Sequence, residues 1–133
     1  MSVETIVFSI LSTNAAVGAL IGVGGACKVY PDEIPQGVTM PAVSYEIVAG
    51  VPEGVMNGAP VADDMRIQIN AYANDDRDAA RALSEAIERA FEDLDVMIEK
   101  GCGIRCISWN GVDFDDELKR YRDSKDYRFW TSR

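Results

Sequence analysis

Apolar residues recur with helical spacing in two stretches of the chain. Between residues 3 and 21, and again between residues 79 and 94, they fall at intervals of three and four, which is typical of an amphipathic helix. In the first stretch, the Ser-Thr-Asn run at 12–14 consists of residues that favour helix caps, so this segment is expected to be one bent helix or two shorter helices. The glycines within 22–25 are expected to end it.

Other stretches alternate apolar and polar residues in the manner of β-strands. The alternation is clear in 42–49 and 65–73, and strand-like sequence returns in 104–109, 112–114 and 121–131. A strand with one apolar and one polar side is typical of an antiparallel sheet that buries one of its faces. The sequence therefore predicts a mainly antiparallel sheet.

The segment between the first two predicted strands is rich in prolines and glycines. Its Asn57-Gly58 pair favours a tight type I′ turn. Residues 51–62 are therefore predicted to form a protruding hairpin arm with its tip at Asn57, or else a mobile loop. By the same argument, Asn110-Gly111 is predicted to form a turn.

The order of these elements is helix, strands, helix, strands. It predicts an α+β fold in which two helices pack on one face of the sheet and leave the other face uncovered. The chain has 133 residues, of which 47% are hydrophobic and 26% charged, so it is long enough for one core and too short to favour two. Residues 1–133 are predicted to form a single domain.

The chain carries a strong negative charge, which bears on its partners. Its 22 acidic and 13 basic residues give a net charge of −9, which opposes attraction to phosphate backbones. The C-terminal segment 120–133 does combine arginines with aromatic residues, but acidic residues lie among them. We therefore expect no sequence-specific nucleic-acid binding, and we interpret this segment as a surface for packing against protein.

Targeting signals and cysteines indicate where the chain works. No apolar run is long enough to cross a bilayer, and the N-terminus lacks the basic and apolar pattern of a secretory signal. We therefore expect no membrane partner and assembly in a cytoplasm. Cys27, Cys102 and Cys106 cannot all pair within one chain, so free thiols are expected.

The chain shows no pattern that indicates catalysis or metal binding. It contains no histidine, which is the commonest proton-transfer residue near neutral pH. Cys102 and Cys106 would share one side of a strand, but zinc needs four ligands, and a free cysteine or carboxylates would have to supply the rest. The acidic run 113–117 lacks the ligand spacing of an EF-hand. We therefore expect no enzyme, no cofactor and no metal site.

Several short motifs follow one another in a set order and together span most of the chain. They are Lys28-Val29, Pro35-Gln36-Gly37, Pro41 to Tyr45, the strand 66–72, the helix 79–91 and the ending Asp126-Tyr127-Arg128-Phe129-Trp130. This series resembles the tail-completion, or tail-terminator, family of long-tailed, siphovirus-like phages. In that family a basic-apolar pair after the first helix precedes a Pro-Gln-Gly turn and a strand that begins with proline.

This resemblance implies a structural virion protein that forms a hexameric ring on the head-proximal end of the tail tube. Such a ring would end tube polymerisation and provide the head–tail joining surface, because it matches the tube but offers no surface for further addition. The implied partners are other copies of the chain, the major tail-tube protein and a head-completion or connector protein, with genome DNA passing through the ring. The implied location is the head–tail neck of the virion tail.

We predict that the arm and the C-terminal strand contact neighbouring subunits or the tube, since surface loops commonly carry such functions. For Trp130, packing in the subunit's own core is an equally good alternative. The residues predicted to lie in the interface are Val51, Val55, Met56, Asn57, Phe129 and Trp130.

Two other functions fit the same sequence. The first is a head-completion or connector ring protein, seated on the portal side of the same virion. The second is a small cytoplasmic ligand-binding or enzyme domain with a pocket between sheet and helices. A deep apolar cavity with converging polar groups and a carboxylate of shifted pKa would favour this second alternative.

Overall fold

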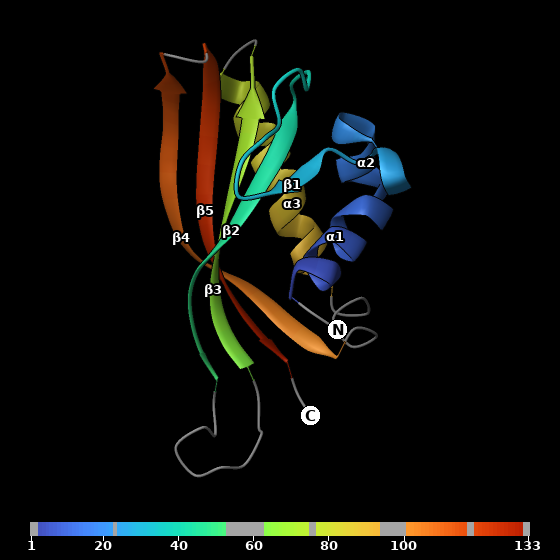
Figure 1. The fold of residues 1–133 in the computed structure, drawn as a ribbon, viewed down its shortest axis with the longest axis vertical. Helices are drawn as coiled ribbons and strands as arrows, with labels where there is room; N and C mark the ends of the chain where they lie inside the picture. Colours follow the sequence, from blue (N-terminus) through green and yellow to red (C-terminus); the bar gives the residue numbers. More distant parts are fainter. Residues whose placement is uncertain are drawn as a thin grey trace.

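The computed structural model describes residues 3–22, 24–52, 63–74, 77–93, 101–116 and 119–131 (Figure 1). A five-stranded sheet forms one layer, and α-helices lie against one of its faces. This confirms the predicted α+β class with a mainly antiparallel sheet.

The N-terminal segment forms two helices. The helices α1 (Val3–Thr13) and α2 (Ala15–Ile21) meet at an angle of 88°. Asn14 causes the break, because its backbone is extended and its side chain accepts a hydrogen bond of 3.0 Å from the amide of Val17. Of the two predicted alternatives, two shorter helices is therefore the correct one. Gly22, with φ of 96°, ends α2, and a short 3₁₀ turn, η1 (Gly24–Ala26), follows.

The third helix, α3 (Arg77–Phe91), lies behind the strands in Figure 1 and packs on β3, β4 and β5. Its buried residues follow helical spacing and its charged residues face outward, as the sequence predicts. The helix therefore separates an apolar face, pressed on the sheet, from a charged outer surface.

The strand order in the sheet is β1-β2-β3-β5-β4. Among the described strands, only the β1–β2 pair is parallel. The bounds of the strands are β1 (Val29–Pro31), β2 (Ala42–Pro52), β3 (Asp63–Ala73), β4 (Cys102–Asp115) and β5 (Arg120–Thr131).

Strands β2 and β3 are longer than the sequence predicts. Their pairing extends to Pro52 opposite Asp63, so the base of the predicted arm is a paired ribbon that runs beyond the helices in Figure 1. Residues 53–62, which include the predicted tip, lie outside the described residues. Whether the segment ends as a hairpin or a loop stays a prediction.

The predicted turn at Asn110-Gly111 is wrong. Strand β4 continues through these residues, and its register with β5 shifts between Trp109 and Val112. The positive φ of Gly111, 88°, lets the backbone absorb the one extra residue as a bulge instead of reversing direction. A second shift, between Cys106 and Ser108, bends the same strand.

A single cluster of buried apolar side chains lies between the helices and the sheet. It joins residues of α1, α2 and α3 to the inward side of β2, β3, β4 and β5. The largest fully buried side chains are Tyr127, Phe91, Phe129, Ile6, Leu11, Ile21, Ile67, Leu83, Ile87, Val7, Val17 and Val43.

The second face of the sheet is only partly open, which corrects the prediction of a wholly uncovered face. Ser44, Asn70 and Ser124 lie side by side on β2, β3 and β5, are buried, and hydrogen-bond to one another at 3.3 and 2.5 Å. The segment 32–41 passes in front of the sheet in Figure 1, and the sulfur of its Met40 lies 4.0 Å from the guanidinium of Arg120. This loop thus covers part of the second face.

Among the described helices, none is by itself long and apolar enough to span a membrane. Helices α1 and α2 meet the length and composition criteria only when taken together as a sharply bent pair.

Candidate functional site

The residues predicted to form an interface do not lie together. Val51 is near the end of β2, opposite Asp64 of β3. Val55, Met56 and Asn57 lie outside the described residues. Phe129 is fully buried in the subunit's own core, so its side chain is not available to a neighbouring molecule in this conformation.

Trp130 is half-buried and lies on the open face of the sheet. Its indole ring lies over Gly103, the residue opposite it on β4: a Cβ added at Gly103 would come within 2.2 Å of the ring. The guanidinium of Arg128 lies 5.5 Å from the ring centre, within the range of a cation–π contact. Trp130 therefore packs against its own sheet while keeping part of its surface exposed.

Three arginines form a continuous row on this open face. Arg66 of β3 is opposite Arg128 of β5, which is opposite Arg105 of β4. All three are exposed, and we call them the arginine row. Arg66 donates to the carboxylate of Asp126 at 3.0 Å, whereas Arg105 has no ion pair within the described residues. Like charges directly opposite each other in a sheet are unfavourable, so an anionic group placed over the row would reduce this repulsion.

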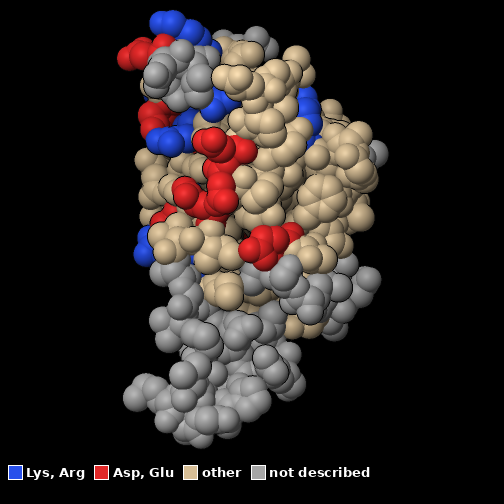
Figure 2. All heavy atoms as spheres, viewed as in Figure 1, with Lys and Arg blue, Asp and Glu red and all other residues tan. Residues whose placement is uncertain are grey.

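Figure 2 shows how charged side chains are distributed over one side of the molecule, viewed as in Figure 1. Lys and Arg side chains lie mainly along the side of β4 and β5, and Asp and Glu side chains lie nearer the middle. The surface is therefore mixed in charge, unlike the continuous basic surface that a phosphate backbone requires.

Three glutamates form a matching stripe on the helix side of the molecule. Glu85, Glu88 and Glu92 follow one another at intervals of three and four residues, so they lie on one side of α3. Glu92 directly follows α3, and its amide still donates to the carbonyl of Glu88 at 3.1 Å. We call these three residues the acidic stripe. Among them, Glu88 pairs with the buried Lys125 of β5 at 2.7 Å.

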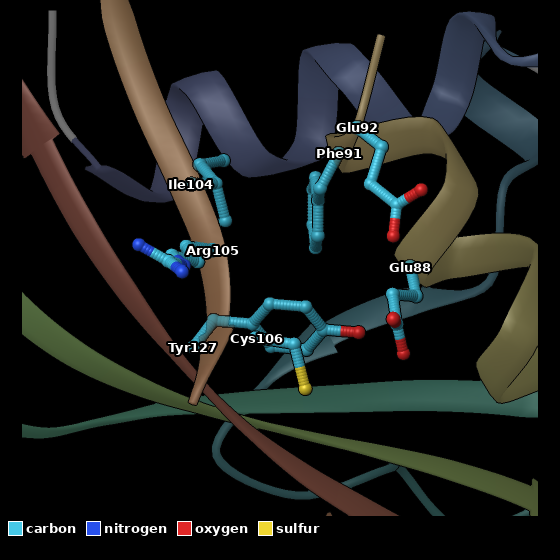
Figure 3. A pocket seen from close by; sticks show the side chains of 7 residues that line it. All are labelled: Glu88, Phe91, Glu92, Ile104, Arg105, Cys106 and Tyr127. Carbon is cyan, nitrogen blue, oxygen red and sulfur yellow. The ribbon is translucent and has the colours of Figure 1, made fainter. Parts of the chain in front are cut away.

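A pocket of about 300 Å³ opens beside the acidic stripe, between α3 and β4 (Figure 3). Phe91 and Ile104 line its apolar side. In Figure 3 the carboxylates of Glu88 and Glu92 lie on the same side as the phenol oxygen of Tyr127, whereas the guanidinium of Arg105 points away. The pocket is therefore bordered by negative charge.

Tyr127 contributes an unsatisfied group to this pocket. Its side chain is 1% exposed, and its hydroxyl has no hydrogen-bond partner among the described residues. Burial raises the pKa of Tyr127 well above its ordinary value, and the nearby Cys106 and Glu88 add to this shift. The hydroxyl thus remains protonated. A buried hydroxyl without a partner is unfavourable, so this atom is suited to bind a group that enters the pocket.

A second pocket, of about 230 Å³, lies next to the first along α3, and Glu88 lines both. At its base is the fully buried Asp123, one of whose carboxylate oxygens, Oδ2, has no partner in the described part of the chain. The other, Oδ1, accepts a hydrogen bond of 3.0 Å from the indole of Trp109. Burial raises the pKa of Asp123, although the hydrogen bonds from Trp109 and Ser84 oppose this shift.

Strand β4 forms a long edge of the sheet. On its far side no strand pairs with it among the described residues. Three of its large apolar side chains are also strongly exposed, Ile107 by 48%, Trp109 by 52% and Phe114 by 41%. Exposed edge strands with apolar side chains are suited to contact another protein chain.

The arginine row, the acidic stripe and the two pockets were not predicted from the sequence. The glutamates could have been found from their helical spacing, but the row depends on the register between three strands. Within the described residues, no group of three or more acidic or cysteine side chains could hold a metal ion, and no disulfide joins the three cysteines. The pockets are near the lower limit of small-molecule sites and are lined by many charged side chains, unlike the deep apolar cavity expected of a ligand-binding domain.

Comparisons with known proteins agree with this architecture. One solved structure, described as the virion of a native gene transfer agent (GTA) particle, contains a chain with 17% sequence identity and a TM-score of 0.71. The match covers 99% of this chain and 96% of that chain, and at this identity it establishes the fold alone. Among curated proteins, none matches the chain. The family model for Tail completion protein gp17 matches residues 5–132. The chain therefore belongs to the Tail completion protein gp17 family and is a structural protein of the virion tail.

Proposed function

We propose that this protein forms a ring of six copies on the head-proximal end of the tail tube, where it stops tube growth and provides the surface to which the head is joined. The observation that carries the proposal is the family match over residues 5–132, which spans nearly the whole chain. The number six and the position at the neck rest on the resemblance of the motifs between Lys28 and Trp130 to tail terminators.

Features of the subunit support a role in assembly. The long β4 edge carries exposed apolar side chains, and the two sides of the molecule differ in chemistry. A ring needs two different surfaces on each subunit that fit each other head to tail. A ring that closes leaves no such surface free, which is how it would end the growth of a tube.

Under this proposal the protein acts by shape and has no catalytic role. Its partners are other copies of the chain, the tail-tube protein and a head-completion or connector protein. Of the predicted interface residues, Trp130 keeps exposed surface for these contacts and Val51 lies near the end of β2, whereas Phe129 supports the subunit's core. Genome DNA passes through the ring without sequence-specific contacts, since the net charge of −9 opposes phosphate binding.

The deciding experiment is electron microscopy of lysates from a phage that lacks this gene product. Tails of uncontrolled length are expected, and expression of the protein from a plasmid should restore uniform tails. Tails of normal length that fail to join heads would reject the terminator role and favour the alternative of a head-completion ring. Gold-labelled antibodies on wild-type particles should mark the neck.

A further inference from the structure

We infer that neighbouring copies in this ring contact each other head to tail, with the arginine row of one copy seated on the acidic stripe and the two pockets of the next. The inference rests on the proposed ring and names the contact that would build it. Each surface is formed within the free subunit. One copy supplies three guanidinium groups, and the next supplies carboxylates and two unsatisfied buried atoms.

The two surfaces match in length. The acidic stripe extends over seven residues of helix, which is about 10 Å at a rise of ~1.5 Å per residue. The arginine row crosses three adjacent strands, which is also about 10 Å at a spacing of ~4.8 Å. Three positive groups and three negative groups thus have nearly the same spacing.

Each surface also contains like charges whose mutual repulsion the other surface would reduce. Arginines opposite one another in a sheet repel, and glutamates three and four residues apart on a helix repel as well. Within the subunit these charges are only partly balanced. Glu88 pairs with Lys125, Glu85 pairs with Arg81 at 3.4 Å, and Arg66 pairs with Asp126. Neither Glu92 nor Arg105 has an ion pair among the described residues. Contact between the surfaces would relieve both repulsions.

The pockets beside the stripe contain atoms that a guanidinium could satisfy. The phenol oxygen of Tyr127 and Oδ2 of Asp123 are buried, have no partner among the described residues and lie in adjacent pockets that share Glu88. Arginine presents several N–H donors in a planar fork, so one head group can bind a carboxylate and a neighbouring oxygen together. The pockets are large enough for side chains and are bordered by carboxylates.

The positions of the two surfaces favour a chain of contacts that continues from copy to copy. The arginine row lies on the open face of the sheet, and the acidic stripe lies on the helix side. Arg105 also borders the first pocket, but its guanidinium points away from the carboxylates of Glu88 and Glu92 (Figure 3), so a subunit does not pair its own two surfaces in this conformation. Each copy binds one neighbour with its row and the next with its stripe, as ring closure requires. Nucleic acid fits the row poorly, because the carboxylate of Asp126, two residues from Arg128 on β5, pairs with Arg66 on the same face.

Two double variants test the contact, each of which removes one surface without altering the core. Glu85→Gln with Glu92→Gln neutralises the stripe, and Arg105→Gln with Arg128→Gln neutralises the row; all four side chains are exposed. Native mass spectrometry and sedimentation at low salt should show oligomers for the wild type and monomers for each variant. An equimolar mixture of the two variants should give a 1:1 dimer, because it retains one intact contact and cannot extend it.

Control variants carry the same charge changes at other exposed positions. They are Glu4→Gln with Glu33→Gln for the stripe and Arg77→Gln with Lys119→Gln for the row, and both should associate as the wild type does. Variants that still form wild-type oligomers, or a mixture that stays monomeric, would overturn the contact. A wild type that stays monomeric would do the same, because both surfaces already exist in the free subunit and need no template.

The Tyr127→Phe variant tests the contact between subunits without disturbing the folding of the subunit. It removes only a hydroxyl that has no partner in the described part of the subunit, so the midpoint of urea unfolding should not fall. The association constant should fall about tenfold, the effect of losing one hydrogen bond to a charged group. Unchanged association would argue against a guanidinium in this pocket.

Failure of this contact and failure of the proposed function are distinguishable. Phage that carry the stripe and row variants, and still have uniform tails, would reject the contact while the terminator role stands. Normal tails in the complete absence of the protein would reject the terminator role itself.

Discussion

At the scale of single residues, Gly103 shows how one missing side chain determines a local arrangement. The ring of Trp130 occupies the space where a Cβ of residue 103 would lie, at 2.2 Å from the nearest ring atom. Any other residue would force the indole to move off the sheet. The glycine thus allows a large aromatic side chain to cover the backbone of its neighbouring strand.

We therefore expect Gly103→Ala to lower the free energy of unfolding by about 1–3 kcal/mol, the usual range for overpacking. Urea denaturation would measure the loss. Gly25→Ala is the matched control, because a Cβ there meets nothing within 4 Å. In a Trp130→Ala background the cost of Gly103→Ala should disappear. A cost that persisted in that background would show that the indole is not its cause.

Asp123 makes stability depend on pH in an unusual direction. Its folded-state pKa is raised by burial above the value of about 3.9 expected for an unfolded chain. Between these two pKa values the native state binds more protons than the unfolded state, so the contribution of Asp123 to stability falls as pH rises through this window. The Asp123→Asn variant lacks this titrating group, while the amide oxygen of its new side chain could still accept the hydrogen bond from Trp109.

The expected result is that the stability of the wild type relative to Asp123→Asn falls as pH rises from about 4. The measurement is urea unfolding of both proteins at a series of pH values. A difference that stays constant with pH would show that the carboxyl titrates alike in the folded and unfolded chains.

At the scale of elements, capping residues and bulges decide where helices and strands change direction. Asn14 ends one helix and begins the next, and the resulting bend lets Val17 and Ile21 of α2 reach the same core as α1. In β4, Gly111 converts a predicted turn into a bulge, and the strand continues along β5. The Asn14 cap and the Gly111 bulge both change the direction of the backbone.

Removing the cap should be measurable. We expect Asn14→Ala to destabilise the protein by about 1 kcal/mol, because the amide of Val17 loses its partner at 3.0 Å. Asn14→Asp should retain most of the stability, since aspartate caps equally well. Thermal unfolding followed by circular dichroism would compare the three proteins. Equal loss in both variants would mean that the cap hydrogen bond is not what stabilises the bend.

At the scale of the whole molecule, the exposed edge of β4 and the charge asymmetry of the two faces favour self-association. The edge offers unpaired backbone groups together with Ile107 and Trp109, both about half exposed. A lysine on such an edge is a common means of preventing contact with another chain. The side chain at position 107 therefore tests whether the edge takes part in the ring.

Ile107→Lys should abolish or strongly weaken ring formation in sedimentation experiments and leave the unfolding midpoint of the monomer nearly unchanged. Leu20→Lys is the control, because Leu20 is also exposed, at 41%, and its helix α2 lies on the opposite side of the molecule from β4 (Figure 1). If both lysine variants associate normally, the β4 edge is not part of the subunit contact.

The sequence by itself determined the elements whose signals are local. Helical spacing identified α3 and the broken N-terminal helix, alternation identified β2 and β3, and the order of elements predicted the α+β class. The family resemblance came from the same local motifs, and the match over residues 5–132 confirms it. These predictions succeed because each depends on residues that are neighbours along the chain.

Only the tertiary structure decided which side chains meet. Arg66, Arg105 and Arg128 are far apart in sequence, and they form a row solely because β3, β5 and β4 pair in one register. Phe129 and Trp130 were both predicted to lie in the interface. The alternation of side chains along β5 instead buries Phe129 in the core and leaves Trp130 on the open face. The register of the strands, and which face of the sheet each side chain lies on, depend on pairing between distant segments. That pairing exists only in the folded chain and has no local signal in the sequence.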